Sequence, residues 1–154
     1  MIASKRMVRI PPDRAGEEWT GPVMVRGWLR VCQPWRHPFA VLTLLRKWIR
    51  LKRDVDRASG LLFFEYWQRL DALVFGMHVG WSDREHLDHL YECESHRDIA
   101  KWATASSLIR AMKLETMAIS GDGRIAHLGG FYICAEESDL PNDSLFPLSD
   151  GRRA

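Results

Sequence analysis

The order in which the hydrophobic pattern changes its period constrains this fold more than any other feature of the sequence. Apolar residues alternate with polar ones from residue 23 to 31, the pattern of a strand with one buried face. After Pro38 the period becomes helical and continues to Ser59-Gly60, where glycine favours the end of a helix. A strand followed by an amphipathic helix is therefore expected over the first third of the chain.

The middle of the chain predicts a hairpin and a second helix. Residues 61–69 and 73–81 are short runs rich in aromatic and aliphatic side chains, joined by three residues with turn character. Ser82 is followed three residues later by Glu85, which predicts a capping box and a helix start directly after Trp81. This helix is expected to reach about Ser106, with a bend near Glu94-Ser95.

Two further strands complete the pattern, over residues 108–119 and 125–135, with the turn sequence Ser-Gly-Asp-Gly between them. The order β-α-β-β-α-β predicts an α+β, ferredoxin-like domain over residues 21–136, with an extra C-terminal strand. Both helices are expected on one face of the sheet, which leaves the other face, with His78, for a second subunit. Residues 1–20 are interpreted as an irregular arm and residues 137–154 as a polar tail.

Charge is spread unevenly along a chain whose net charge is only +2. Residues 36–57 hold seven Lys and Arg, whereas residues 81–98 hold six Asp and Glu against two Arg. The two segments could face each other or bind different partners. Three widely spaced cysteines and the absence of a long apolar run predict a cytoplasmic protein without a transmembrane helix.

Two stretches carry a resemblance to a known superfamily: "HVGWSDREHLDHL" and "SHRDIAKW", which follow the Ser59-Gly60 end of the basic helix. Over residues 23–119 the chain resembles the dimeric α+β barrel superfamily, which holds the antibiotic biosynthesis monooxygenases and the spheroidene monooxygenase-like proteins. In the latter, a strand ending in Trp precedes Ser and acidic residues, and a His follows about fifteen positions later. Trp81, Ser82 and His96 match that pattern.

This resemblance implies a homodimer with a cavity between sheet and helices for a hydrophobic small molecule or heme. Some members oxidise substrates without a cofactor, and others are not oxygenases. The heme-degrading members carry an Asn on the first strand, which residues 23–31 lack.

His96 is the first candidate for the site, either as a general base or as the axial ligand of heme. Trp81 and Tyr66 are the other catalytic candidates. Each of the three could instead be a packed residue with a satisfied polar group. Four further side chains are expected to hold the substrate: Phe64, Phe75, Met77 and Trp102.

Two other groups of residues could form a metal site or a membrane-binding surface. On a regular helix His86, His89, Cys93 and His96 would share one arc and could hold zinc, but a bend would scatter them, so no metal site is predicted. The basic side of the first helix could contact an anionic membrane through Arg46, Lys47, Arg50 and Arg53, or simply be solvated. Nucleic acid is not expected, because the aromatic residues of this helix lie on the opposite arc.

The sequence therefore supports two functional hypotheses. One is a monooxygenase-like enzyme that acts on an aromatic or polyene molecule, either cofactor-free or with heme. The other is a non-catalytic ligand-binding or scaffold subunit that uses the barrel to dimerise and its basic helix to bind a larger complex or a membrane surface.

Overall fold

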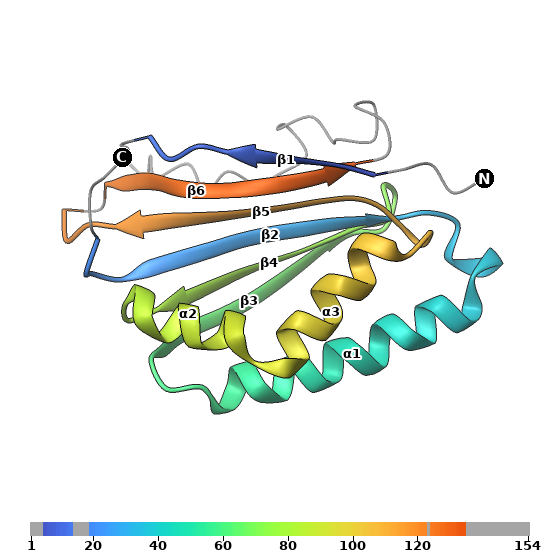
Figure 1. Cartoon of the computed structure of the whole chain (residues 1–154), viewed down its shortest axis with the longest axis horizontal. Coiled ribbons are helices and arrows are strands. Elements are labelled where there is room, and N and C mark those ends of the chain that lie inside the picture. The colour runs from blue at the N-terminus through green and yellow to red at the C-terminus, as the bar shows by residue number, and fades with distance from the viewer. Residues whose placement is uncertain (1–4, 14–18, 123, 135–154) are drawn as a thin grey trace.

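The computed structural model describes residues 5–13, 19–122 and 124–134, and it consists of one antiparallel sheet with helices on one face (Figure 1). The elements, in chain order, are β1 (Arg6–Ile10), β2 (Val23–Val31), the 3₁₀ turn η1 (Pro34–Arg36), α1 (Pro38–Arg57), β3 (Leu61–Arg69), β4 (Val74–Trp81), α2 (Arg84–Glu92), α3 (Glu94–Ala105), β5 (Ile109–Ile119) and β6 (Ile125–Cys134). The polar tail predicted for residues 137–154 lies outside the described residues.

The strand order in the sheet is β1-β6-β5-β2-β4-β3. Four of its strands, β5-β2-β4-β3, form the ferredoxin-like arrangement, in which β2 has β4 and β5 as antiparallel neighbours. The predicted fold class is thus confirmed. The extra C-terminal strand is confirmed as well, because β6 extends the sheet beside β5.

Strand β1 corrects the expectation of an irregular arm over residues 1–20. Residues 6–10 pair with β6, from Arg6 opposite Cys134 to Ile10 opposite Gly130. The segment has only five residues and two exposed arginines, so its own pattern gives no strand signal. It becomes a strand because the edge of β6 offers unpaired backbone groups, and this edge exists only in the folded sheet.

The helix after β4 begins one residue later than the expected capping box places it. The N-cap of α2 is Asp83, whose carboxylate accepts a hydrogen bond from the backbone N–H of His86 at 3.0 Å. The Ser82 N–H instead donates to the Gly60 carbonyl. The bend expected near residues 94 and 95 is confirmed, and it is a complete break, because Cys93 has an extended backbone and separates α2 from α3.

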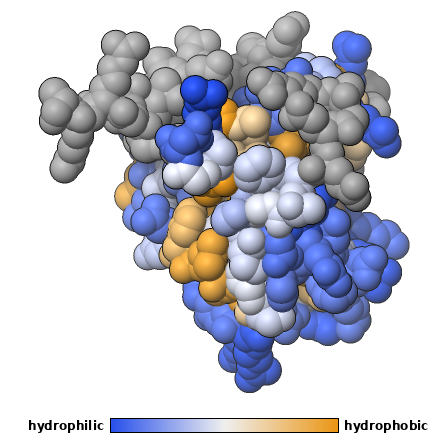
Figure 2. Space-filling view, turned by 90° about the vertical axis from the view of Figure 1, so that its left-hand side faces the viewer, coloured by the Kyte–Doolittle hydropathy of each residue, from blue (hydrophilic) through white to orange (hydrophobic). Residues whose placement is uncertain are grey.

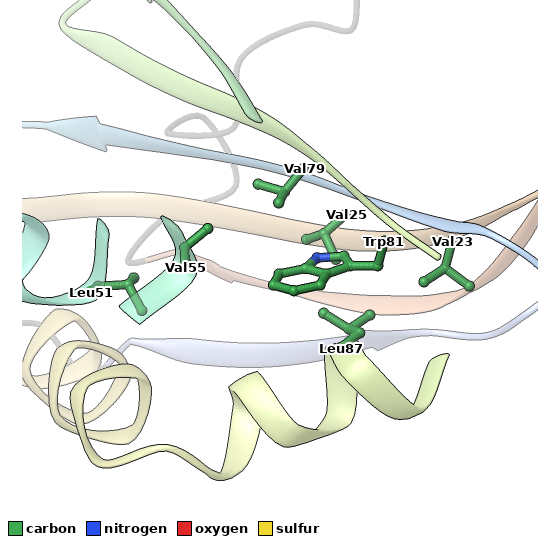
Figure 3. Packing of buried hydrophobic residues seen from close by; sticks show 7 residues of the cluster. All are labelled: Val23, Val25, Leu51, Val55, Val79, Trp81 and Leu87. Atoms are coloured by element: carbon green, nitrogen blue, oxygen red, sulfur yellow. The ribbon is translucent and has the colours of Figure 1, made fainter. Parts of the chain in front are cut away.

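Among the described residues, the largest fully buried side chain is that of Trp81, which lies between the sheet and the helices (Figure 3). Its cluster draws on β2, β4, α1 and α2, and it consists of Val23, Val25, Leu51, Val55, Val79, Trp81 and Leu87. Val79 and Trp81 of β4 are buried on the side of the sheet that faces the helices. Truncating a Trp at such a position typically costs about 3–5 kcal/mol.

The two oppositely charged segments of the chain face each other. Lys47 of α1 pairs with Asp98 of α3 at 2.5 Å, and Arg50 pairs with Glu94 at 2.9 Å. Figure 1 shows α1 and α3 side by side, with α1 at the outer edge of the helical layer. Among the described residues, no helix is both long and apolar enough to cross a bilayer.

Candidate functional site

The break at Cys93 brings the end of α2 against the first turn of α3 and thereby joins Tyr91 to His96. The centroids of the two rings are 4.8 Å apart, with 50° between the ring planes. The His96 side chain, which is half-buried, also hydrogen-bonds to the backbone of Tyr91. The structure therefore gives His96 a fixed position and one occupied ring nitrogen.

Burial lowers the pKa of His96 from its usual 6.5, and the hydrogen bond to the Tyr91 backbone opposes this shift only in part. The imidazole is accordingly neutral near pH 7. One ring nitrogen carries the proton that the Tyr91 carbonyl accepts, so the other nitrogen holds a lone pair. A neutral imidazole in apolar surroundings is suited to act as a base.

Tyr91 connects His96 to the sheet. It packs against the Trp81 cluster, and its hydroxyl hydrogen-bonds with the side chain of Thr116 on β5. Burial raises the pKa of Tyr91 above its usual 10.0, so this hydroxyl stays protonated. The sequence analysis missed Tyr91, although it follows Leu87 by four residues and so continues the apolar side of α2.

Trp81 is completely buried, and its indole N–H has no hydrogen-bond partner among the described residues. Buried donors are nearly always paired, so an unpaired one indicates a place where a water molecule or a ligand atom can bind. Phe64 and Met77 are partly buried against the same cluster. The structure thus brings Trp81, Phe64 and Met77 together, and Tyr91 links them to His96.

Three other predicted site residues lie elsewhere. Phe75 and Trp102 pack against a second cluster, around Val31 and Leu108 at the other end of the helical layer. Tyr66 is 73% exposed on the edge strand β3 and belongs to neither cluster. Tyr66 pairs with Met77 and so lies on the helix side of the sheet, but the helices do not cover it, and its catalytic role stays a prediction.

The four potential zinc ligands are not brought together. Three of them, His86, His89 and Cys93, border a surface cavity of about 150 Å³ between the end of α1 and α2. His86 is held by Asp83, with 2.8 Å between its Nδ1 and the carboxylate, and His96 lies beyond the helix break. In the part of the chain that the structure describes, no three such side chains are placed to hold a metal ion. This end of the molecule is predominantly hydrophilic (Figure 2).

The hydrogen bonds to Asp83 affect its charge. The backbone N–H and then the side chain of His86 lower the pKa of this carboxyl group to about 2. Asp83 is therefore ionised over the physiological range. It anchors the start of α2, and nothing in the geometry assigns it to chemistry.

The face of the sheet opposite the helices carries a row of charged residues across four strands. The register places Glu65 opposite His78, His78 opposite Arg26, and Arg26 opposite Glu115. Glu115 is buried and pairs with Arg26 at 2.8 Å and with Lys113 at 3.0 Å. Burial alone would raise the pKa of Glu115, but the hydrogen bonds from these two cations outweigh burial and hold the pKa below 4.5.

Gly76 and Gly80, on either side of His78, do not leave bare backbone on this face. The ring of Trp67 lies over Gly76, and the ring of Phe63 lies over Gly80. Both rings come from β3 of the same chain. A partner that meets this face would therefore contact aromatic side chains rather than bare backbone.

Comparison with known proteins identifies the fold without identifying a family. No family model and no curated protein matches the sequence. Several solved structures do match, although their sequence identities are low. A "putative antibiotic biosynthesis monooxygenase" from Caulobacter crescentus is 15% identical, with a TM-score of 0.51, over 66% of this chain and 92% of its own.

Two other matches have similar scores. A protein from Shewanella oneidensis is 12% identical, with a TM-score of 0.52, over 65% of this chain and 92% of its own. A protein from Mycobacterium tuberculosis is 14% identical, with a TM-score of 0.51, over 63% of this chain and 93% of its own.

Proposed function

We propose a monooxygenase-like function for this chain, whose fold is that of the antibiotic biosynthesis monooxygenase-like proteins, a ferredoxin-like α+β arrangement. At such low identities the shared fold does not transfer an activity. The case for a function must therefore come from the chain's own residues.

We propose that the chain is a monooxygenase-like enzyme that acts on a hydrophobic small molecule, aromatic or polyene, bound beside His96. The supporting observation is the half-buried, neutral imidazole of His96, whose ring is fixed by Tyr91 and whose second nitrogen can accept a proton. Phe64 and Met77 supply apolar surface in the neighbouring cluster. The unpaired indole N–H of Trp81 supplies a hydrogen-bond donor for an oxygen atom of the substrate.

In the cofactor-free route, His96 removes a proton from an activated CH₂ group that is conjugated to an aromatic ring. The resulting carbanion gives electrons to dioxygen, one oxygen atom bonds to the carbon, and the CH₂ group becomes C=O. The second oxygen atom leaves as water with the two hydrogens. The substrate supplies all the electrons, so no external reductant is required.

A heme-dependent route is the other form of this proposal. An imidazole that donates one N–H to a backbone carbonyl presents its other nitrogen in the tautomer that binds iron. His96 would then hold the iron, and heme would supply the activation of oxygen. Tyr91 would fix the ring orientation in either case.

Oxygen uptake with an anthrone-like substrate, together with an absorption spectrum before and after heme addition, tests the proposal. The wild-type protein should consume oxygen, and His96→Gln should lower the rate about 10²- to 10⁴-fold, because a general base is lost. His89→Gln is the matched control, since His89 lies exposed on α2. A Soret band that disappears in His96→Gln would select the heme route. Equal oxygen uptake by wild type and His96→Gln would remove His96 from the mechanism.

One observation favours a second candidate, a non-catalytic ligand-binding or scaffold subunit. Trp81 is 0% exposed, so its neighbours fill the space around it in this conformation. For this candidate, the protein purified from its source should be bound stoichiometrically in a larger assembly and show no turnover. Turnover that depends on His96 would decide against it.

A further inference from the structure

Helix α1 has two different apolar sides. Toward the sheet, Leu51 and Val55 are buried and Trp48 packs near Phe64, with 6.0 Å between ring centroids. Outside this buried side, α1 and the preceding turn expose five large apolar residues: Trp35 at 70%, Phe39 at 84%, Leu42 at 44%, Leu45 at 51% and Ile49 at 51%. The core already has its packing side, so the second side needs another explanation.

Two arginines share the second side of the helix. Phe39, Leu42, Arg46, Ile49 and Arg53 follow one another by three or four residues, which places them on one side of an α-helix. The expectation that the aromatic residues of this helix lie opposite its basic residues is therefore wrong for Phe39. We call these five residues, together with Trp35, the outward face. Arg46 and Arg53 are exposed, and neither forms an ion pair with any residue that the structure describes.

The other basic residues in the middle of α1 are neutralised within the protein. Lys47 pairs with Asp98, Arg50 with Glu94, and Lys52 with Asp56. The first turn of α1 contains no acidic residue. Positive charge therefore remains uncompensated on the outward face and is compensated on the flank that meets α3.

From this arrangement we infer that the outward face of α1 binds an anionic membrane surface. Aromatic and aliphatic side chains enter the boundary between headgroups and acyl chains, while arginines on the same face reach the lipid phosphates with their long stems. Trp35 and Phe39 lie at the start of the helix and are the most exposed of the apolar set. They are accordingly the residues that insert.

Repulsion between like charges argues against a second copy of this chain as the partner that binds the outward face. Two outward faces in contact would bring the unpaired Arg46 and Arg53 of one chain near the same residues of the other, and like charges repel. An anionic lipid surface supplies the opposite charge and an apolar layer together. The inference is independent of the proposed enzyme activity, because none of the outward-face residues belongs to the His96 site.

Co-sedimentation of the full chain with phosphatidylcholine vesicles containing about 30% phosphatidylserine tests the inference. Wild type should bind these vesicles and bind pure phosphatidylcholine much more weakly. Arg46→Gln with Arg53→Gln should weaken binding about 30-fold, since each basic residue near an anionic surface contributes about fivefold. Phe39→Ser should also weaken binding, through the loss of inserted apolar surface.

The matched control is Lys47→Gln with Arg50→Gln, which removes the same two formal charges from the flank that faces α3. Its loss of affinity for the anionic vesicles should be several-fold smaller than that of the Arg46→Gln, Arg53→Gln variant. A thermal melt checks that both variants are folded. Equal losses in the two double variants would overturn the inference, because general charge rather than this face would then drive binding. The inference would also be overturned if the wild-type protein bound neither kind of vesicle. If such a protein instead bound immobilised polyglutamate, the partner of the outward face would be an acidic protein.

Discussion

At the scale of single residues, the burial of His96 links stability to pH. Burial lowers the pKa of His96 below 6.5 in the folded state, so the unfolded chain takes up a proton more readily. The contribution of neutral His96 to the free energy of unfolding is fully present above pH 6.5, and it is lost as the pH falls through the pKa of His96 in the folded state. We expect His96→Gln to flatten the stability profile between about pH 5 and 7, measured by urea unfolding. Parallel profiles for wild type and variant would show that His96 titrates normally.

A second residue-scale prediction concerns Gly76, which lies under the ring of Trp67. A Cβ atom at this position would lie 2.1 Å from the Trp67 ring, so the ring must move. Gly76→Ala should destabilise the protein by about 1–3 kcal/mol through overpacking, as measured by urea unfolding. Gly121→Ala is the control, because a Cβ there meets nothing within 4 Å. Equal effects of the two substitutions would mean that the Trp67 ring moves freely.

At the scale of the elements, the sheet is joined across its width by side chains as well as by backbone hydrogen bonds. Glu115 of β5 accepts hydrogen bonds from Arg26 of β2 at 3.2 and 2.8 Å, and it also contacts Lys113 on its own strand. The same register continues to His78 on β4 and Glu65 on β3. One buried carboxylate therefore anchors the β5 end of this row.

Removal of that carboxylate should destabilise the sheet. Glu115→Ala leaves Arg26 without its acidic partner, and we expect a loss of about 3 kcal/mol in the free energy of unfolding. Glu115→Gln should lose less, because the amide oxygen still accepts a hydrogen bond. The pKa of Glu115 is below 4.5 in the folded state, so its stabilisation is present above pH 4.5 and disappears as the pH falls further. An alanine variant as stable as wild type at pH 7 would contradict this account.

At the scale of the whole molecule, a homodimer through the face opposite the helices remains a prediction. This face carries the aromatic rings of Phe63 and Trp67, a residue type that is enriched in interfaces, beside the exposed carboxylate of Glu65. Light scattering at about 10 μM should give twice the mass of one chain. Glu65→Arg should lower this mass, whereas Glu85→Arg on exposed α2 should not. A wild-type monomer at this concentration would refute the prediction.

Local periodicity explains how much of the fold could be predicted. The hydrophobic pattern of residues 23–31, of the helix after Pro38 and of the hairpin predicted every element of the ferredoxin-like core, because side chains within one element sort by its own repeat. The candidate site was predicted less completely. His96 and Trp81 were named from the sequence, whereas Tyr91, which connects them, was not.

By itself the sequence determined the order of strands and helices and the position of the bend that separates α2 from α3. Only the tertiary structure decided that β1 joins the sheet, that Tyr91 meets His96, and that Arg46 and Arg53 stay unpaired while Lys47 and Arg50 bind α3. The physical reason is distance along the chain. Periodicity describes neighbours within an element, whereas pairing, ion pairs and exposure depend on residues far apart in the sequence that come together only when the sheet and helices pack.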